Sequence, residues 1–567
     1  MNKSLLIHQD NVDEDRIKIG KAITFDIESD NIDREMITFI NTHLSNQDLK
    51  IIIIKDSLSR NYLEFYGLLL AHHIRLSNDE TIKYLPIIII SDLNIYQLNK
   101  LTSLANICYS DGIYLVDNDS FKIENLLNKD LKGLEKSNYY QSFLDFINIK
   151  PPSNYDSKHS IANEWSIYQW AKFLEIENKE IEENISSMLY FKYLQAQNPK
   201  DYLVDNSNKD KINIFQKGKI LFIDDEWAKG WKQIFKKQFK SNPNFLVLEK
   251  EFKGKKQNEI IEMVINYIDI NNLPDIIILD LRLSDDDFDF NYDKNLDKIT
   301  GIQLIKKIHK INPAIQIILW TASGDSNILN KANSLNILGY IKKEYPGDRT
   351  VDVNNSIKIL SSLIDEGLSK SYLKKIWDIQ KNILELNLFK EEDDSFKQIK
   401  LEVNSVFETL DSNMENRLNY AMFAIFKCIE IITALYIEEQ RRNAYWINGS
   451  QIMNTGYLKL REESYTSNLE HIKNENIQAN RGSGKTATEN KIRTIMNEKL
   501  GLKSNRRHSY IKCLVCIRNH TIHQDKQYED KDFCKKVVEE KISKDNILTW
   551  FKMLQTILKK VSNEQSN

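Results

Sequence analysis

The sequence predicts two α/β units in series, followed by an all-α region that forms a helical bundle. Short apolar runs rich in isoleucine recur through the first 140 residues and again over residues 219–343, with helix-like segments between them. Runs of this kind are typical of parallel strands buried on both faces of a doubly wound sheet. After residue 353 the periodicity is helical, and from Phe396 onward we expect no strand.

Residues 1–150 are expected to form the first α/β unit. Its predicted strands are residues 22–25, 51–54, 86–90 and 112–116. A helix is predicted over residues 62–75, whereas the interval between residues 26 and 50 is short for a complete strand–helix unit. The sequence therefore predicts an open parallel sheet with one compressed connection.

The dipeptide Pro151-Pro152 marks a domain boundary, because proline pairs punctuate regular structure. Residues 151–216 are expected to form a helical linker, with helix over 159–198. Its aromatic side chains are expected to pack the two α/β units together: Trp165, Tyr168, Trp170, Phe173, Tyr190 and Phe191.

The second unit carries polar residues where its predicted strands end. Asp224 and Asp225 follow the run 219–223, and Asp280 follows the run 275–279. Thr321 and Lys343 end the next two runs. The carboxyl ends of parallel strands meet at one edge of a sheet, so these five residues are expected to share one pocket.

The residue types in this pocket suit phosphoryl transfer. The carboxylates of Asp224, Asp225 and Asp280 offer the oxygen ligands that Mg²⁺ prefers. Asp280 is expected to attack phosphorus as a nucleophile. Lys343 would pair with the new phosphate, and the Thr321 hydroxyl would turn toward it and move its loop.

These residues resemble the receiver domain of two-component response regulators over residues 217–366. The resemblance implies that Asp224 and Asp225 are the acidic pair, Asp280 the phosphoacceptor, and Thr321 and Lys343 the switch residues. Lys342 is the alternative for the lysine, because the strand register is uncertain by one residue. Glu344 stands where the family usually has proline.

Two further features of the second unit leave alternatives open. Residues 284–298 lengthen the loop after Asp280 with an acidic insertion, which is either a solvated loop or a shield over the site. The alternative for the whole constellation is a receiver-like sheet that is never phosphorylated.

The first unit resembles a degenerate receiver when its strands are laid against those of the second. The positions of the phosphoacceptor, switch hydroxyl and lysine then fall on Lys55, Ser91 and Val116. The first unit is therefore predicted to be silent in phosphotransfer, with Asp56 as the alternative, a displaced acceptor.

The C-terminal region is expected to comprise a helical connector over residues 367–396 and a helical domain over 397–567. Helices are predicted over residues 417–442, 491–500, 530–543 and 546–560, and an apolar helix precedes the segment 518–523. In that segment Arg518 can hold two phosphate oxygens, and the imidazole of His523 can act as acid or base near neutral pH. Asn519 and His523 share a helix face, whereas Arg518 points about 140° away from His523.

This segment resembles the motif of HEPN domains, helical bundles many of which are metal-independent ribonucleases. The resemblance implies that Arg518, Asn519 and His523 cleave RNA, with a homodimer supplying two sets of residues to one cleft. The alternative is a structural role for Arg518 and His523 at a helix end.

Two other patterns in the C-terminal region are weaker. Zinc ligation would need Cys513, Cys516, His520 and His523, but these four lie along one helix stripe where tetrahedral ligation is difficult. Residues 481–486 imitate a phosphate loop, although Ala479 replaces its first glycine and no strand precedes it. We expect a flexible basic loop there.

Composition limits the partners. The chain has 567 residues, a net charge of −3 and five scattered cysteines, which suits reduced thiols and a cytoplasmic location. We expect no transmembrane helix, no signal peptide and no membrane partner. The resemblances imply a sensor histidine kinase or phosphotransfer protein, RNA and a second copy as partners, and a setting like the effectors of two-component-type antiphage defence systems.

The two resemblances together predict a phosphorylation-controlled ribonuclease. Two other functions are alternatives to it. The first is a non-enzymatic signalling adaptor whose helical C-terminal domain binds a partner protein. The second is a DNA-binding output, which is weaker because no helix-turn-helix with a basic recognition helix is evident.

Overall fold

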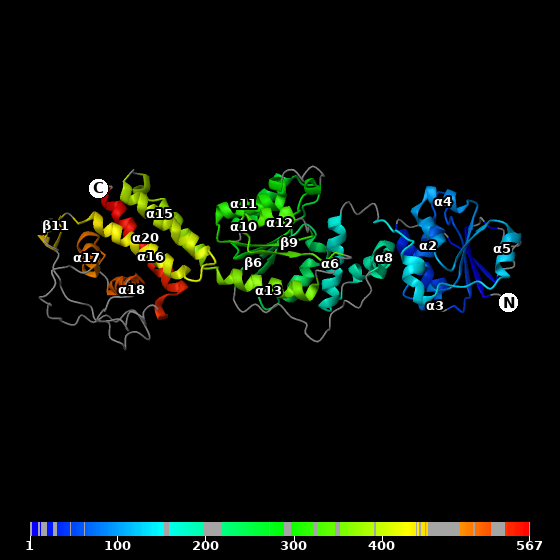
Figure 1. Ribbon diagram of the computed structural model, residues 1–567. Helices are drawn as coiled ribbons and strands as arrows, with labels where there is room; N and C mark the ends of the chain where they lie inside the picture. Colours follow the sequence, from blue (N-terminus) through cyan, green and yellow to red (C-terminus); the bar gives the residue numbers. More distant parts are fainter. Residues whose placement is uncertain are drawn as a thin grey trace.

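The structure is a computed structural model with three parts in a row, and Figure 1 shows the two termini at opposite ends. Two α/β units are joined by helices that include α6 and α8, and a helical region completes the chain. The structure describes residues 3–9, 12, 20–25, 31–45, 47–61, 63–151, 158–177, 179–197, 218–270, 273–288, 296–322, 326–345, 352–390, 393–437, 439–441, 444–447, 450–451, 488–502, 505–522 and 539–565.

The first unit is a five-stranded parallel sheet of order β2-β1-β3-β4-β5. Its strands are β1 (Ser4–His8), β2 (Lys21–Thr24), β3 (Ile51–Lys55), β4 (Ile87–Ser91) and β5 (Ile113–Asp117). Its main helices are α1 (Ile32–Phe39), α2 (Tyr66–Arg75), α4 (Ile95–Leu101) and α5 (Ser120–Leu127), with the short α3 (Glu80–Lys83) after α2. The predicted parallel sheet is confirmed, and β1 is an additional strand that the sequence analysis missed.

The second unit repeats this topology in the order β10-β9-β8-β6-β7. Its strands are β6 (Ile220–Ile223), β7 (Phe245–Val247), β8 (Ile276–Leu279), β9 (Gln316–Thr321) and β10 (Gly339–Lys342). Its helices are α9 (Trp231–Gln238), α10 (Gln257–Ile270), α11 (Thr300–Ile311), α12 (Ser326–Asn333) and α13 (Val353–Ser369). Both units thus have the doubly wound arrangement whose ligand site lies at the carboxyl edge.

The apolar strands of the second sheet face helices on both sides. Ile276 and Ile278 of β8 belong to a core that includes α9 and α13, whereas Ile277 and Leu279 belong to a core with α10 and α11. Side chains alternate between the two faces of a strand, so a continuous isoleucine run fills both cores. In Figure 1, α10, α11 and α12 lie on one side of this sheet and α13 on the other.

The linker helices are α6 (Lys158–Phe173), α7 (Lys179–Ser187) and α8 (Leu189–Gln197). One apolar core is continuous from the first sheet through these helices to α9 and α13 of the second unit. Trp170 of α6 lies 5.2 Å, centroid to centroid, from Trp320 of β9, and Trp165 stacks on Phe191 of α8 at 6.4 Å. The linker aromatics therefore pack between the two units, as expected.

The C-terminal region is mostly helical. It contains α14 (Leu373–Leu384), α15 (Asp394–Asp411), α16 (Arg417–Leu435), α17 (Thr488–Thr494), α18 (Asn505–Ile522) and α20 (Lys544–Gln565). These helices share one apolar core, and α14, which falls in the expected connector, contributes Leu373, Ile376 and Ile383 to it.

Two expectations for this region are wrong. Helix α16 ends at Leu435 instead of continuing to 442, and three short antiparallel strands follow: β11 (Glu439–Arg441), β12 (Ala444–Ile447) and β13 (Ser450–Gln451). Strands this short are not recognisable from an alternation of apolar and polar residues. Their formation depends on hydrogen bonding between neighbouring strands, which the sequence of one segment does not determine.

The expectation that no segment reaches transmembrane length also needs correction. Helix α16 is long and apolar enough by length and composition, with a mean hydropathy of 1.6 over its window. Half of that window is buried inside the protein. Ile425, Ile429 and Ile432 lie in the core of the helical region, which is the packing of a core helix.

Candidate functional site

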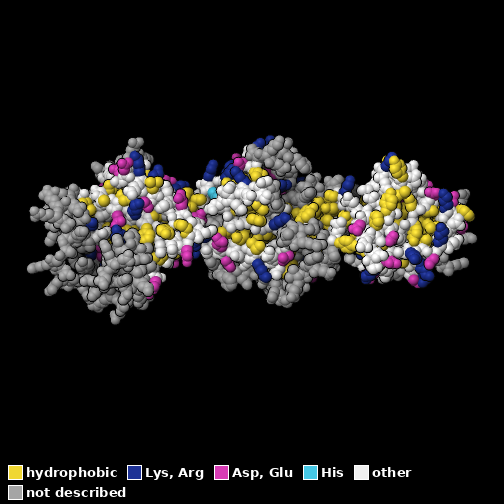
Figure 2. Space-filling view, viewed as in Figure 1, with side chains coloured by type: hydrophobic (Ala, Val, Ile, Leu, Met, Phe, Trp, Pro, Cys, Tyr) yellow, Lys and Arg dark blue, Asp and Glu magenta, His cyan; other side chains and the backbone are white. Residues whose placement is uncertain are grey.

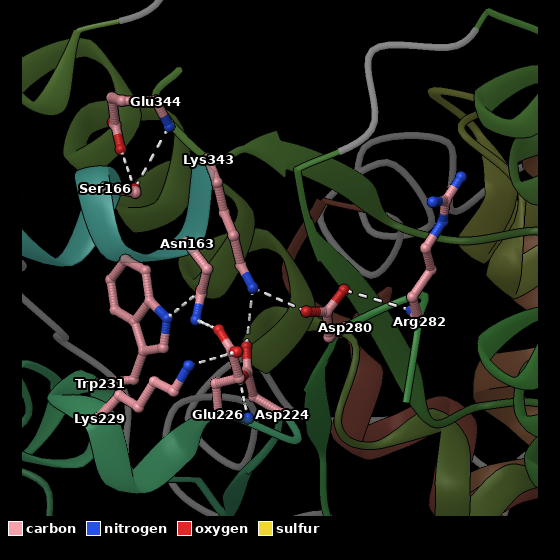
Figure 3. Close-up of polar contacts among 10 residues, drawn as sticks. All are labelled: Asn163, Ser166, Asp224, Glu226, Lys229, Trp231, Asp280, Arg282, Lys343 and Glu344. Carbon is pink, nitrogen blue, oxygen red and sulfur yellow. Dashed lines mark hydrogen bonds and ion pairs between the residues drawn. The ribbon is translucent and has the colours of Figure 1, made fainter. Parts of the chain in front are cut away.

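A buried lysine joins two carboxylates at the carboxyl edge of the second sheet. Lys343 Nζ lies 2.7 Å from Asp280 Oδ2 and 3.0 Å from Asp224 Oδ2, and all three side chains are fully buried (Figure 3). Asp224 follows β6, Asp280 follows β8 and Lys343 follows β10. Lys342 is the last residue of β10, so the structure places Lys343, not Lys342, between the carboxylates.

Burial and nearby charge raise the pKa of two carboxyl groups in this pocket. Burial raises the pKa of Asp224 to about 6; the charge of Lys343 opposes this shift, and the charge of Asp280 adds to it. Burial and the neighbouring carboxylates also hold the pKa of Asp225 well above its usual range. Burial lowers the pKa of Lys343, but attraction to Asp224 and Asp280 outweighs it and the pKa is raised. The site therefore has more negative charge than one lysine balances.

The three carboxylates fit a divalent cation. One oxygen each from Asp224, Asp225 and Asp280 lies within 4.8 Å of the others. The Oδ1 atom of Asp225 is buried and has no hydrogen-bond partner in the structure. An unpaired buried carboxylate oxygen is costly, and a hard cation such as Mg²⁺ would satisfy it.

Thr321 lies on the strand beside the lysine. It is the buried last residue of β9 and pairs with Lys342 of β10. The carbonyl oxygen of Thr321 accepts a hydrogen bond of 2.7 Å from the backbone N–H of Lys343. All five residues that the sequence predicted for this pocket therefore lie at the same edge of the sheet.

The sequence did not predict the contacts that linker helix α6 makes beside this pocket. The side chain of Asn163 donates to Glu226 Oε2 and accepts from Trp231 Nε1 at 2.7 Å. Ser166 donates to Glu344, the residue after Lys343. Only the unusual Glu344 was a signal in the sequence, and nothing there indicated its partner.

Glu344 is almost fully buried and well satisfied. Besides Ser166, its carboxylate accepts hydrogen bonds of 2.9 Å from Trp170 Nε1 and from Ser356 Oγ. Its backbone N–H donates to Ser166 Oγ at 3.3 Å. Burial raises the pKa of Glu344, which the hydrogen bonds partly offset.

The start of the acidic insertion folds back on itself. Asp287 Oδ2 accepts from the N–H groups of Leu283 and Ser284 at 3.0 and 3.1 Å, and Asp287 Oδ1 accepts from Thr300 N at 2.9 Å. This buried carboxylate therefore ties the loop to the start of α11. Residues 289–295 lie outside the described residues.

The equivalent edge of the first sheet is occupied by an internal polar cluster. Lys55 Nζ contacts Asp56 Oδ1 at 2.9 Å and Asp92 Oδ2 at 2.7 Å, and Ser91 Oγ donates to Asp56 Oδ2 at 2.5 Å. By strand register Lys55 and Ser91 stand where the second unit has Asp280 and Thr321, as predicted.

The predicted equivalent of the lysine in the first unit is wrong. Ser91 pairs with Asp117, as Thr321 pairs with Lys342, so the position of Lys343 falls on Asn118 instead of Val116. The error arises because β5 continues to Asp117, beyond the apolar run. An asparagine still offers no charge for a phosphate.

The C-terminal motif is only partly described. Arg518 lies near the end of α18, and its Nη2 atom is 3.9 Å from Glu430 Oε1 of α16. Asn519 lies in α18, but its side chain is outside the described residues, as are His523 and residues 481–486. Cys513 and Cys516 are buried in the helical core.

A comparison with known families supports the interpretation of the first unit. Residues 3–116 match the iREC family, described as an inactive receiver domain. A comparison with curated proteins found no match to this chain. The expectation of a degenerate receiver-like unit at the N-terminus is confirmed, and a receiver-like unit indicates a regulator of the two-component signalling type.

Proposed function

We propose that this protein is a phosphorylation-controlled regulator whose second α/β unit accepts a phosphoryl group on Asp280. The observation that carries the proposal is the Lys343 ammonium between Asp224 and Asp280, with the unpaired oxygen of Asp225 beside them. The first unit supports the assignment by contrast, because Lys55 stands there at the position of Asp280 and pairs with Asp56 and Asp92.

The chemistry is group transfer to a carboxylate. An oxygen of Asp280 forms a bond to phosphorus, the bond from phosphorus to the donor's histidine nitrogen breaks, and that electron pair leaves with the imidazole. Mg²⁺, held by Asp224, Asp225 and Asp280, would balance charge on the phosphoryl oxygens. Lys343 would move its hydrogen bonds from the carboxylates to the new phosphate. The donor is a sensor histidine kinase or a phosphotransfer protein.

Mass spectrometry of the intact protein tests this assignment. Incubation with a small phosphodonor and Mg²⁺ should add one phosphoryl group per chain. Asp280→Asn should abolish the addition, and Asp56→Asn should leave it unchanged, because Asp56 is held by Lys55, Ser91 and the backbone of Ser57. Full phosphorylation of the Asp280→Asn variant would place the acceptor elsewhere.

For the output we propose that the C-terminal helical region cleaves RNA as a homodimer, in a setting like two-component-type antiphage defence. The support is the sequence Arg518-Asn519 with His523 at the end of an apolar helix, in a region with one helical core. The second candidate is a non-enzymatic adaptor, and the contact between Arg518 and Glu430 favours it, because that carboxylate competes with phosphate for the guanidinium.

A further inference from the structure

Helix α6 precedes the second unit in the chain but contacts both sides of its polar pocket. Asn163, Ser166 and Trp170 lie at spacings of three and four residues, which places them on one face of the helix. Asn163 and Ser166 are fully buried. Figure 3 shows Asn163 directed at Glu226 and Ser166 directed at Glu344.

Each of these carboxylates adjoins a residue of the pocket. The backbone N–H of Glu226 donates to Asp224 Oδ1 at 2.8 Å, while the side chain of Glu226 binds Asn163. Glu344 directly follows Lys343 in the chain, while its carboxylate and backbone N–H both bind Ser166. Helix α6 therefore contacts two residues, Glu226 and Glu344, each of which is the immediate chain neighbour of a pocket residue.

Phosphorylation should disturb the second of these contacts most. Lys343 Nζ is now held by Asp224 and Asp280, and a phosphoryl group on Asp280 would draw Nζ outward to the phosphate oxygens. Glu344 directly follows Lys343 in the chain, so a backbone shift of Lys343 that accompanies this movement also displaces Glu344. A small displacement weakens buried hydrogen bonds steeply, since their geometry is narrow.

The same helix leads on to the first unit. Trp165 of α6 stacks on Phe191 of α8, and the N–H of Leu189 at the start of α8 donates to Asp33 Oδ2 of α1 at 3.0 Å. Asp33 Oδ1 in turn lies 2.9 Å from Nε2 of the buried His73. Helices α6 and α8 thus connect the pocket of the second unit with the helices of the inactive one.

We infer that α6 senses the phosphorylation state of the second unit through Glu226 and Glu344, and passes it to the inactive N-terminal receiver. This inference rests on the proposed phosphorylation of Asp280. The N-terminal unit then acts as a recipient of the signal, which explains how a unit without phosphotransfer chemistry serves in the same chain.

Hydrogen–deuterium exchange of the full-length protein tests the inference, with and without treatment by a small phosphodonor and Mg²⁺. Phosphorylation should speed amide exchange in α6 and α8 by about tenfold, the effect of losing one buried hydrogen bond. Unchanged exchange in fully phosphorylated protein would overturn the inference. Intact mass of the same samples reports the phosphate, so an absence of phosphate overturns the proposed function itself.

Variants separate signal transfer from simple packing. Ser166→Ala, and Trp170→Phe, which keeps the ring but loses the N–H donor, should still be phosphorylated but should lose most of the difference between the two states. Lys237→Ala is the matched control, because Lys237 Nζ fixes the end of α6 by donating to the carbonyls of Leu174 and Glu175, away from the pocket. It should keep the full difference. A full difference in the Ser166 and Trp170 variants would overturn the route through Glu344.

Discussion

Trp170 Nε1 donates a hydrogen bond of 2.9 Å to Glu344 Oε2, and this bond joins linker helix α6 to the residue after Lys343. The two residues are 174 positions apart in the chain. The linker is therefore part of the second unit's structure and not a passive spacer. A truncation that begins at the first strand of that unit would remove a wall of its core, since Trp170 also packs on Trp320.

Replacement of Lys343 should lower the free energy of unfolding. Lys343→Met leaves the buried carboxylates of Asp224 and Asp280 without their cation, and breaking a buried pair from one side costs about 3–5 kcal/mol. Lys342→Met is the matched control, because Lys342 is partly exposed and lies on the strand itself. Urea unfolding at pH 7 should show a large loss for the first variant and a small one for the second. Equal losses would contradict the placement of Lys343.

Mg²⁺ should stabilise the protein through the three carboxylates. A ligand that binds only the folded state at ten times its Kd stabilises by about 1.4 kcal/mol, so added Mg²⁺ should raise the Tm of the second unit. Asp225→Asn should remove most of this shift, because Asp225 Oδ1 is the buried oxygen without a partner. Asp286→Asn, at an exposed site in the acidic insertion, should keep it. A shift that survives in the Asp225 variant would place the cation elsewhere.

The first unit should lose stability at mildly acidic pH. Burial lowers the pKa of His72 from 6.5 to about 4, so the folded state holds it neutral while the unfolded chain binds a proton. The stabilisation is complete above pH 6.5 and is lost as the pH falls toward 4, by about 3 kcal/mol in all.

The His72→Gln variant tests this dependence. The free energy of unfolding of the first unit should change less between pH 7 and pH 5 in this variant than in the wild type. Urea denaturation at the two pH values measures this difference. His43→Gln is the control, since His43 is partly exposed and should keep the wild-type dependence. The assignment to His72 would be wrong if both variants kept the full pH dependence.

RNA cleavage should depend on Arg518 and His523. Loss of an oriented imidazole costs about 10²–10⁴-fold in rate, so His523→Ala and Arg518→Ala should each reduce cleavage strongly without a divalent metal. RNA with 2′-deoxy at the scissile position should resist, because the 2′-hydroxyl would be the nucleophile in the proposed reaction, and products should end in a 2′,3′-cyclic phosphate. Dilution of the protein below the dissociation constant of the proposed homodimer should also abolish activity.

Controls separate the two proposed outputs. Both variants should still accept phosphate on Asp280, which shows that the second unit is intact. Undiminished cleavage by the double variant would remove these residues from the nuclease mechanism. An inactive wild type that forms a complex with a partner protein only when phosphorylated would instead support the adaptor.

The sequence by itself determined the class of fold and the members of the main pocket. Isoleucine-rich runs indicate parallel strands that are buried on both faces. Polar residues that directly follow such strands lie at the same edge of the sheet. The positions of Asp224, Asp280 and Thr321 were therefore predicted correctly. The Ser4–His8 strand was missed because only Leu5, Leu6 and Ile7 are apolar between polar neighbours.

Only the tertiary structure decided the register and the neighbours of the pocket. Whether Lys342 or Lys343 meets the carboxylates depends on hydrogen bonding between β9 and β10, and a slip of one residue turns every side chain to the other face. The partners of Glu344 lie on α6, far away in the chain, and no local pattern marks them. Periodicity reports which face of an element is buried, whereas contacts between distant elements are fixed only when their surfaces pack.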